Sequence, residues 1–211
     1  MTDLQTWVAP TYTGLADLLA AGPTAGAGET AGAAGPGGIW DAPSLCEKWL
    51  VRHVVAHVTM PVRLTPERFG AEMAAAGGDF SVLSDTVAER DASLPAAELL
   101  AQLREPGLHA WQPPGGGAEG ALSHAVIHSL DVTIALGLPP VAPAEAVDAI
   151  LGLLAAAEGG WFGLDLTGVR LEAADADWSW GSGTAVRAGR AELVSLLSGR
   201  TLPDGRALPR R

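Results

Sequence analysis

The chemistry-bearing residues of this chain are its histidines, four of which form two His-x-x-x-His pairs. His53 and His57 lie in LVRHVVAHVTM, and His124 and His128 lie in LSHAVIHSLD. Residues four apart share one face of a helix. Neutral imidazole is a common ligand of divalent zinc, iron, copper and nickel. Two helices that turn these faces toward each other would therefore build a metal site, whereas a packing role would require four buried imidazoles to find other hydrogen-bond partners.

The remaining ligand types suggest an open rather than a closed site. Structural zinc usually recruits several cysteines, and Cys46 is the only one here. Three protein ligands leave one position free, which is typical of catalytic metals. Asp131 follows His124 and His128 on the same helix face at i+7. We expect it to orient an imidazole, to meet substrate, or simply to face solvent near the helix end.

The elements that must position these histidines are helices. Apolar periodicity predicts a mainly α-helical chain, and length favours a helix over a strand for the β-branched segment that holds His53 and His57. Ser93 is the expected N-cap of one helix, and Gly137 the expected end of another. An Ala/Gly/Pro-rich loop at residues 21–38 is either a mobile lid or a tolerated insertion. The expected helices span residues 4–19, 50–64, 81–92, 93–104, 121–136 and 143–157.

The pattern changes after Gly159 and Gly160. The segment TGVRLEAADADWSW alternates apolar and polar residues, which predicts a strand. A GSG turn, a short returning strand TAVRA and a helix closed by Gly199 follow it. We therefore expect two domains, a helical bundle at 1–157 and a small α/β unit at 158–211. The second is too small to be stable alone and should pack on the bundle.

Composition excludes several function classes. The formal net charge is −11 and no basic stripe is present, which argues against a nucleic-acid partner. No apolar run approaches the roughly 18–20 residues that cross a bilayer, and the N-terminus lacks the basic region of a signal peptide. A single cysteine suits a reducing cytoplasm. We expect a cytoplasmic monomer or homodimer that acts on a small molecule.

Three motifs together resemble one protein family. SLCEKWLVRHVVAHVTMPVR resembles a helix of the mycothiol-dependent maleylpyruvate isomerase family, part of the DinB-like superfamily. HSLDVTIALGLPP is similar to its later H-x-x-D helix, and DADWSWGSG with RAGRAELVSLLSGR looks like its small C-terminal domain. The resemblance implies a DinB-like four-helix bundle followed by an α/β domain.

The resemblance also implies a ligand set. In that family a divalent metal, typically zinc, is held by a histidine of the second helix and by Glu-x-x-x-His of a later helix. The histidines match His57 and His128, while the glutamate falls on His124. His53 stands where the family usually has aspartate. Fe(II) or nickel would also suit three histidines, and loss of the carboxylate would make the metal a stronger Lewis acid.

The function so implied is that of a metal-dependent isomerase or S-transferase. A low-molecular-weight thiol, mycothiol in the resembling family, or water would occupy the open position and react with a small electrophilic, carboxylated substrate. Asp131 would orient a group or shuttle a proton. Arg200, which matches the family's closing Gly-Arg, and Arg52 would neutralise anionic groups of substrate or cofactor. His53 would be a fourth ligand or a base beside the site.

Two alternatives stay open. The three histidines are also similar to the iron site of DinB-like sulfoxide synthases, which would make the protein a non-haem iron oxygenase or tailoring enzyme. Those enzymes continue as His-x-x-x-His-x-Glu, whereas Asp131 comes one residue later here and their large second domain is missing. The other alternative is a non-catalytic, metal-stabilised DinB-like protein, for which a closed site of four histidines would be the evidence.

Overall fold

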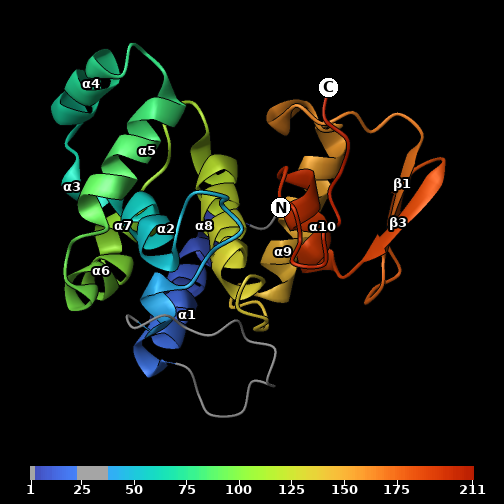
Figure 1. Ribbon diagram of the computed structural model, residues 1–211, viewed down its shortest axis with the longest axis horizontal. Coiled ribbons are helices and arrows are strands. Elements are labelled where there is room, and N and C mark those ends of the chain that lie inside the picture. Colours follow the sequence, from blue (N-terminus) through green and yellow to red (C-terminus); the bar gives the residue numbers. More distant parts are fainter. Residues whose placement is uncertain (1–2, 23–37) are drawn as a thin grey trace.

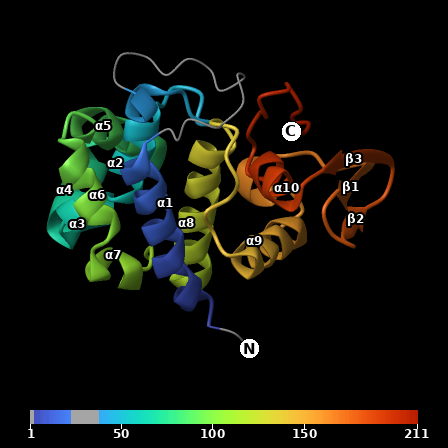
Figure 2. The same cartoon turned by 90° about the horizontal axis from the view of Figure 1, so that it is seen from below.

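The protein is built from a helical bundle and a smaller unit that combines helices with a sheet (Figure 1, Figure 2). The computed structural model describes residues 3–22 and 38–211. The expected fold, mainly α with a small α/β region at the C-terminal end, is confirmed. The loop expected at 21–38 lies, apart from its ends, outside the described residues.

Four helices surround the core of the bundle. The helix α1 packs against α8, and α2 packs against both α5 and α8. Their inner faces are lined by aliphatic side chains that are fully buried, such as Leu15, Val55 and Leu122. A short 3-10 turn, Leu4–Trp7, precedes the first helix. The bounds are α1 Val8–Ala21, α2 Val51–Val58, α5 Phe80–Asp91 and α8 Gly117–Thr133.

Some element boundaries differ from the predictions. The helix expected at 50–64 is broken at Thr59, so α2 is followed by a separate turn, α3 (Met60–Arg63). Pro61 explains the break, because proline has no N–H to continue the helical hydrogen bonds. Ser93 is not an N-cap: its hydroxyl donates to the Arg90 carbonyl, and Pro95 stands at the cap position of α6. The helix α8 begins at Gly117 instead of residue 121.

Three short helices connect these elements. The helix α6 (Ala96–Leu103) packs on α1 and α2. Two others, α4 (Pro66–Ala75) and α7 (Pro106–Ala110), were not predicted. Both begin with proline in the first turn, where a missing N–H costs nothing, and α4 is mostly exposed, so its apolar signal is weak. No helix in the described part of the chain is both long and apolar enough to span a bilayer.

The C-terminal unit packs on the bundle through its helix α10 (Arg190–Leu197). This helix lies against α9 (Ala144–Ala156) and also contacts α8, with which α9 is in contact as well. Leu151 and Leu193 are among the fully buried side chains of these helices. The expected packing of the C-terminal unit on the bundle is therefore confirmed, and the domain boundary between residues 157 and 158 remains a prediction.

The sheet has three strands in the order β2-β1-β3. The single strand expected at 167–180 is in fact two, β1 (Val169–Ala173) and β2 (Ser179–Gly181), which pair antiparallel. The next strand, β3 (Thr184–Ala188), pairs parallel with β1. The chain therefore crosses the start of β1 between β2 and β3. At that crossing Gly183 has φ +121°, and a Cβ there would lie 2.1 Å from the Gly168 carbonyl oxygen.

Candidate metal centre

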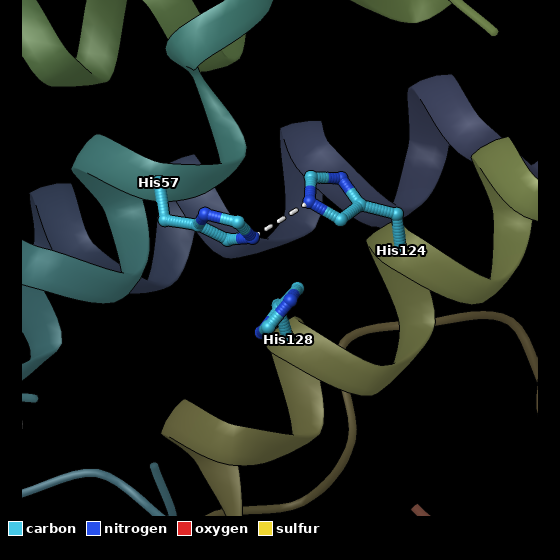
Figure 3. Close-up of side chains that lie close together, drawn as sticks. All are labelled: His57, His124 and His128. Atoms are coloured by element: carbon cyan, nitrogen blue, oxygen red, sulfur yellow. Dashed lines mark hydrogen bonds between the residues drawn. The ribbon is translucent and has the colours of Figure 1, made fainter. Parts of the chain in front are cut away.

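Three histidines converge between α2 and α8 (Figure 3). His57 comes from α2, and His124 and His128 come from successive turns of α8. Their ring centroids form a nearly equilateral triangle with sides of 4.9, 4.7 and 4.9 Å. The Nε2 atoms of His57 and His124 are 3.0 Å apart. One nitrogen from each ring lies within 4.8 Å of the others, so the three side chains can share one metal ion.

The other nitrogen of each ring is anchored to an oxygen atom. The Nδ1 of His57 is 2.8 Å from the Ser84 hydroxyl. The Nδ1 of His124 is 3.1 Å from the Tyr12 hydroxyl. The third anchor joins Nδ1 of His128 to Oδ2 of Asp131 at 2.9 Å.

This arrangement fits a metal. Histidine ligands usually hold their second nitrogen in such a bond, which fixes the ring orientation and leaves Nε2 for the ion. Zinc at about 2.0–2.1 Å from two tetrahedral ligands would place the ligand nitrogens roughly 3.3 Å apart, close to the 3.0 Å between His57 and His124. The three histidines therefore match a divalent metal in both spacing and support.

Burial keeps two of these rings uncharged. Desolvation, with smaller contributions from the neighbouring histidines and Arg200, lowers the pKa of His57 well below its ordinary value. Desolvation followed by the charge of His128 lowers the pKa of His124 to about 3. Neutral imidazole is the form that binds metals, so both rings are in the binding-competent state at neutral pH.

Asp131 is a fully buried carboxylate that anchors a charged network. Its Oδ1 accepts from Nε of Arg200 at 2.8 Å, and its Oδ2 accepts from Nη2 at 2.9 Å. Oδ2 also lies 2.9 Å from the imidazole of His128. Burial raises the pKa of Asp131, but the hydrogen bonds from His128 and Arg200 outweigh it and hold the pKa below its usual range. Asp131 is therefore an ionised group that supports His128.

Arg200 ties the C-terminal unit to the histidine cluster. Burial lowers the pKa of its guanidinium, and the contacts with Asp131 more than restore it, so Arg200 stays charged. Two of its donors are used by Asp131 and a third, Nη1, is 3.3 Å from the Ser198 carbonyl. Arg200 thus lies at the site, as the family pattern implies, but its charge is already compensated.

Cys46 joins the same carboxylate. Its Sγ donates to Oδ2 of Asp131 at 3.0 Å. Burial raises the pKa of this thiol, and the negative charge of Asp131 raises it further. A thiol that stays protonated is a poor nucleophile. The structure therefore supports a hydrogen-bonding role for Cys46 and not that of an attacking thiolate.

A cavity of about 620 Å³ opens beside His57 and His128. One wall comes from the bundle, where the Trp49 ring lies 4.9 Å from that of His57, and the other comes from the C-terminal unit. A small molecule in the cavity can therefore reach two of the three histidines. The lining residues are Leu45, Cys46, Glu47, Lys48, Trp49, His57, Phe80, Ser81, Ser84, Asp85, His128, Phe162, Gly199, Arg200, Thr201 and Arg210.

Two residues expected at the site make their contacts elsewhere. The Nδ1 of His53 accepts the Leu50 N–H at the start of α2, and its Nε2 lies 3.2 Å from Glu89. Within the described residues, His53 is not part of the cluster formed by His57, His124 and His128. Arg52 forms an ion pair with Asp41 at 3.0 Å and does not line the cavity.

Several side chains at the site were not predicted. Tyr12 and Ser84 contact the Nδ1 atoms of His124 and His57, while Trp49 and Arg210 line the cavity. Tyr12 is the only tyrosine of the chain, yet its type and spacing carry no signal that links it to a histidine 112 residues away. Only the tertiary structure reveals these partners.

Comparison with known proteins agrees with the motif analysis. Residues 22–110 match the family described as "Mycothiol maleylpyruvate isomerase N-terminal domain". This part of the chain is similar to that family. The family resemblance expected from the sequence is therefore confirmed. The matched range contains His57 and Ser84, whereas α8 with His124 and His128 lies beyond it.

A solved structure shares the whole architecture. It is a crystal structure of the mycothiol-dependent maleylpyruvate isomerase in which one histidine is replaced by alanine. The similarity has a TM-score of 0.53 at 15% identity and covers 99% of this chain and 95% of that one. At this identity it supports the family's fold and not a shared activity. No curated protein sequence matches the chain.

Proposed function

We propose that the protein is a metal-dependent enzyme of the mycothiol-dependent isomerase or S-transferase type. The proposed substrate is a small, electrophilic, carboxylated molecule, and the proposed co-substrate is mycothiol or a similar thiol. The observation that carries the proposal is the convergence of three anchored imidazoles at the wall of a cavity. The name of the matched family supports the choice of thiol and reaction. We place the reaction in the cytoplasm, in keeping with the single cysteine.

His57, His124 and His128 would hold the metal, most suitably zinc, with Fe(II) and nickel as further candidates. A divalent metal held there would lower the pKa of a bound thiol and fix the position of its sulfur. Three imidazoles contribute no negative charge, and Arg200 already balances that of Asp131. The site therefore favours an anionic partner such as a thiolate more strongly than a site with a carboxylate ligand.

The chain's own residues complete the site. Asp131, held by Arg200, fixes the ring of His128, and its low pKa suits this orienting role better than proton transfer. Trp49 covers one side of His57 and Phe80 lies 6.4 Å from the same ring. These aromatic groups would shield the reacting atoms from water on the bundle side of the cavity.

The alternatives receive less support. The sulfoxide synthases that suggest a three-histidine iron oxygenase continue their motif with a glutamate, and the nearby carboxylate of this chain, Asp131, is engaged by Arg200 and His128. A closed site of four histidines would favour a non-catalytic role, but His53 contacts Glu89 and a cavity adjoins the cluster.

Metal analysis of protein purified without added metal tests the proposal. We expect one equivalent of zinc in the wild type and its loss in His57→Ala and His128→Ala. The control His53→Asn, which keeps an acceptor for the Leu50 N–H, should retain it. Stoichiometric metal in His128→Ala would contradict the ligand set. Isomerisation of maleylpyruvate should require mycothiol, whereas Fe(II) with oxygen-dependent turnover would favour the oxygenase.

A further inference from the structure

The C-terminal wall of the cavity carries a second arginine, Arg210. Its Nη2 donates to the Gly199 carbonyl at 2.7 Å, which is a neutral partner. Within residues 3–22 and 38–211, no carboxylate lies at ion-pair distance from its guanidinium. Arg200, in contrast, is paired with Asp131 through two hydrogen bonds. Arg210 therefore brings an uncompensated positive charge to the cavity.

The backbone around Arg210 is held in place. Arg210 pairs with Leu164 in an antiparallel bridge. On either side of it, the Asp165 N–H donates to the Pro209 carbonyl and the Arg211 N–H donates to the Gly163 carbonyl, both at 2.9 Å. These contacts fix the last residues of the described chain to the segment before the sheet. The guanidinium thus extends from a secured strand-like segment and not from a free end.

Gly199 provides the space for this side chain. Its φ is +74°, a conformation that favours glycine, and a Cβ there would lie 3.2 Å from Nη2 of Arg210. The same glycine supplies the carbonyl that accepts from Arg210. A single glycine therefore both orients the guanidinium and keeps the approach to it open.

The charges on the opposite wall favour this end of the cavity for an anion. The two carboxylates that line the cavity, Glu47 and Asp85, both belong to the bundle, where Lys48 is also present. Because Glu47 and Asp85 outnumber Lys48, the bundle wall has a net negative charge that disfavours a substrate carboxylate, whereas Arg210 attracts it. Guanidinium groups bind carboxylates through paired, charge-assisted hydrogen bonds.

We propose that Arg210 is the residue that binds the substrate carboxylate. This inference rests on the proposed function, and it moves to Arg210 the role that the family pattern implies for Arg200. Binding a substrate through Arg200 would require separating it from Asp131, which is fully buried and would lose its counter-charge. The substrate is then a small acid whose carboxylate lies toward the C-terminal unit and whose electrophilic carbon faces His57 and His128.

Binding of maleate, measured by titration calorimetry, tests the proposal on zinc-loaded and metal-free protein. Arg210→Gln should weaken maleate binding about 10-fold or more in both forms. Binding of the uncharged analogue maleamide should not change. The matched control is Arg187→Gln, which replaces an exposed arginine on β3 that does not line the cavity, and this variant should bind maleate like the wild type.

Kinetics with maleylpyruvate and mycothiol give a second readout. Arg210→Gln should raise KM about 10-fold with kcat nearly unchanged, and Arg210→Lys, which keeps the charge, should recover part of the loss. The proposal would be overturned if Arg210→Gln bound maleate within twofold of the wild type, or if its affinity for maleamide fell equally. It would also be overturned if the wild type did not bind maleate. Because the titration of metal-free protein does not need zinc, a failure of the proposed metal chemistry can be distinguished from a failure of carboxylate binding by Arg210.

Discussion

Replacement of Asp131 by Asn tests whether this carboxylate supports the metal centre. Asp131 is 0% exposed and accepts from Arg200, His128 and Cys46. Removing one partner of a buried ion pair costs about 3–5 kcal/mol. Because the Arg200 side chain stays 20% exposed, we expect the lower end, about 3 kcal/mol, in the unfolding free energy of the metal-free protein. Urea denaturation at pH 7 measures this loss.

The same substitution should also weaken metal binding. Loss of a group that orients a histidine ligand typically lowers metal affinity 10- to 100-fold, or about 1.4–2.7 kcal/mol. Zinc titration against a competing chelator measures the change. Cys46→Ala is the matched control, since it removes one hydrogen bond to the same carboxylate and should alter stability by about 1 kcal/mol and leave zinc affinity unchanged. Zinc affinity of Asp131→Asn within threefold of the wild type would refute the orienting role.

Two further predictions concern stability. Burial raises the pKa of Asp91, but hydrogen bonds from Arg90 and Arg63 outweigh it, so the folded pKa lies below the unfolded one. The ionised Asp91 therefore stabilises the fold above about pH 4, and this stabilisation is lost as the pH falls through the folded pKa. Asp91→Asn should lower the unfolding free energy by about 3 kcal/mol at pH 7 and by less toward pH 3, as measured by urea denaturation. An equal loss at both pH values would contradict this prediction. Gly183 has φ +121°, and a Cβ there would lie 2.1 Å from a carbonyl oxygen, so Gly183→Ala should lower the unfolding free energy by more than about 2 kcal/mol. Gly152 is exposed on α9, so Gly152→Ala should raise the unfolding free energy by up to about 1 kcal/mol. Thermal unfolding of both variants measures the contrast.

The sequence by itself determined the local features of the protein. Spacing of four residues places His124 and His128 on one face of a helix, and the i+3 spacing brings Asp131 beside His128. Apolar periodicity located most of the helices, and the motifs indicated the family. These features depend on neighbours within a few residues, which the helical repeat controls. Where the local signal was weak, as in exposed α4, the prediction failed.

The tertiary structure alone decided how the histidines are used. Spacing along α2 makes His53 and His57 equivalent, but His57 meets His124 of α8, while His53 accepts a hydrogen bond at the start of its own helix. The supporting groups come from distant positions: Tyr12, Ser84 and Arg200 each contact a partner at least 27 residues away. Helix packing brings these groups together, and no periodicity records it. The pairing of charges also depends on tertiary packing, since the burial of Asp131 against Arg200 leaves Arg210 as the arginine of the cavity lining that has no carboxylate partner among the described residues.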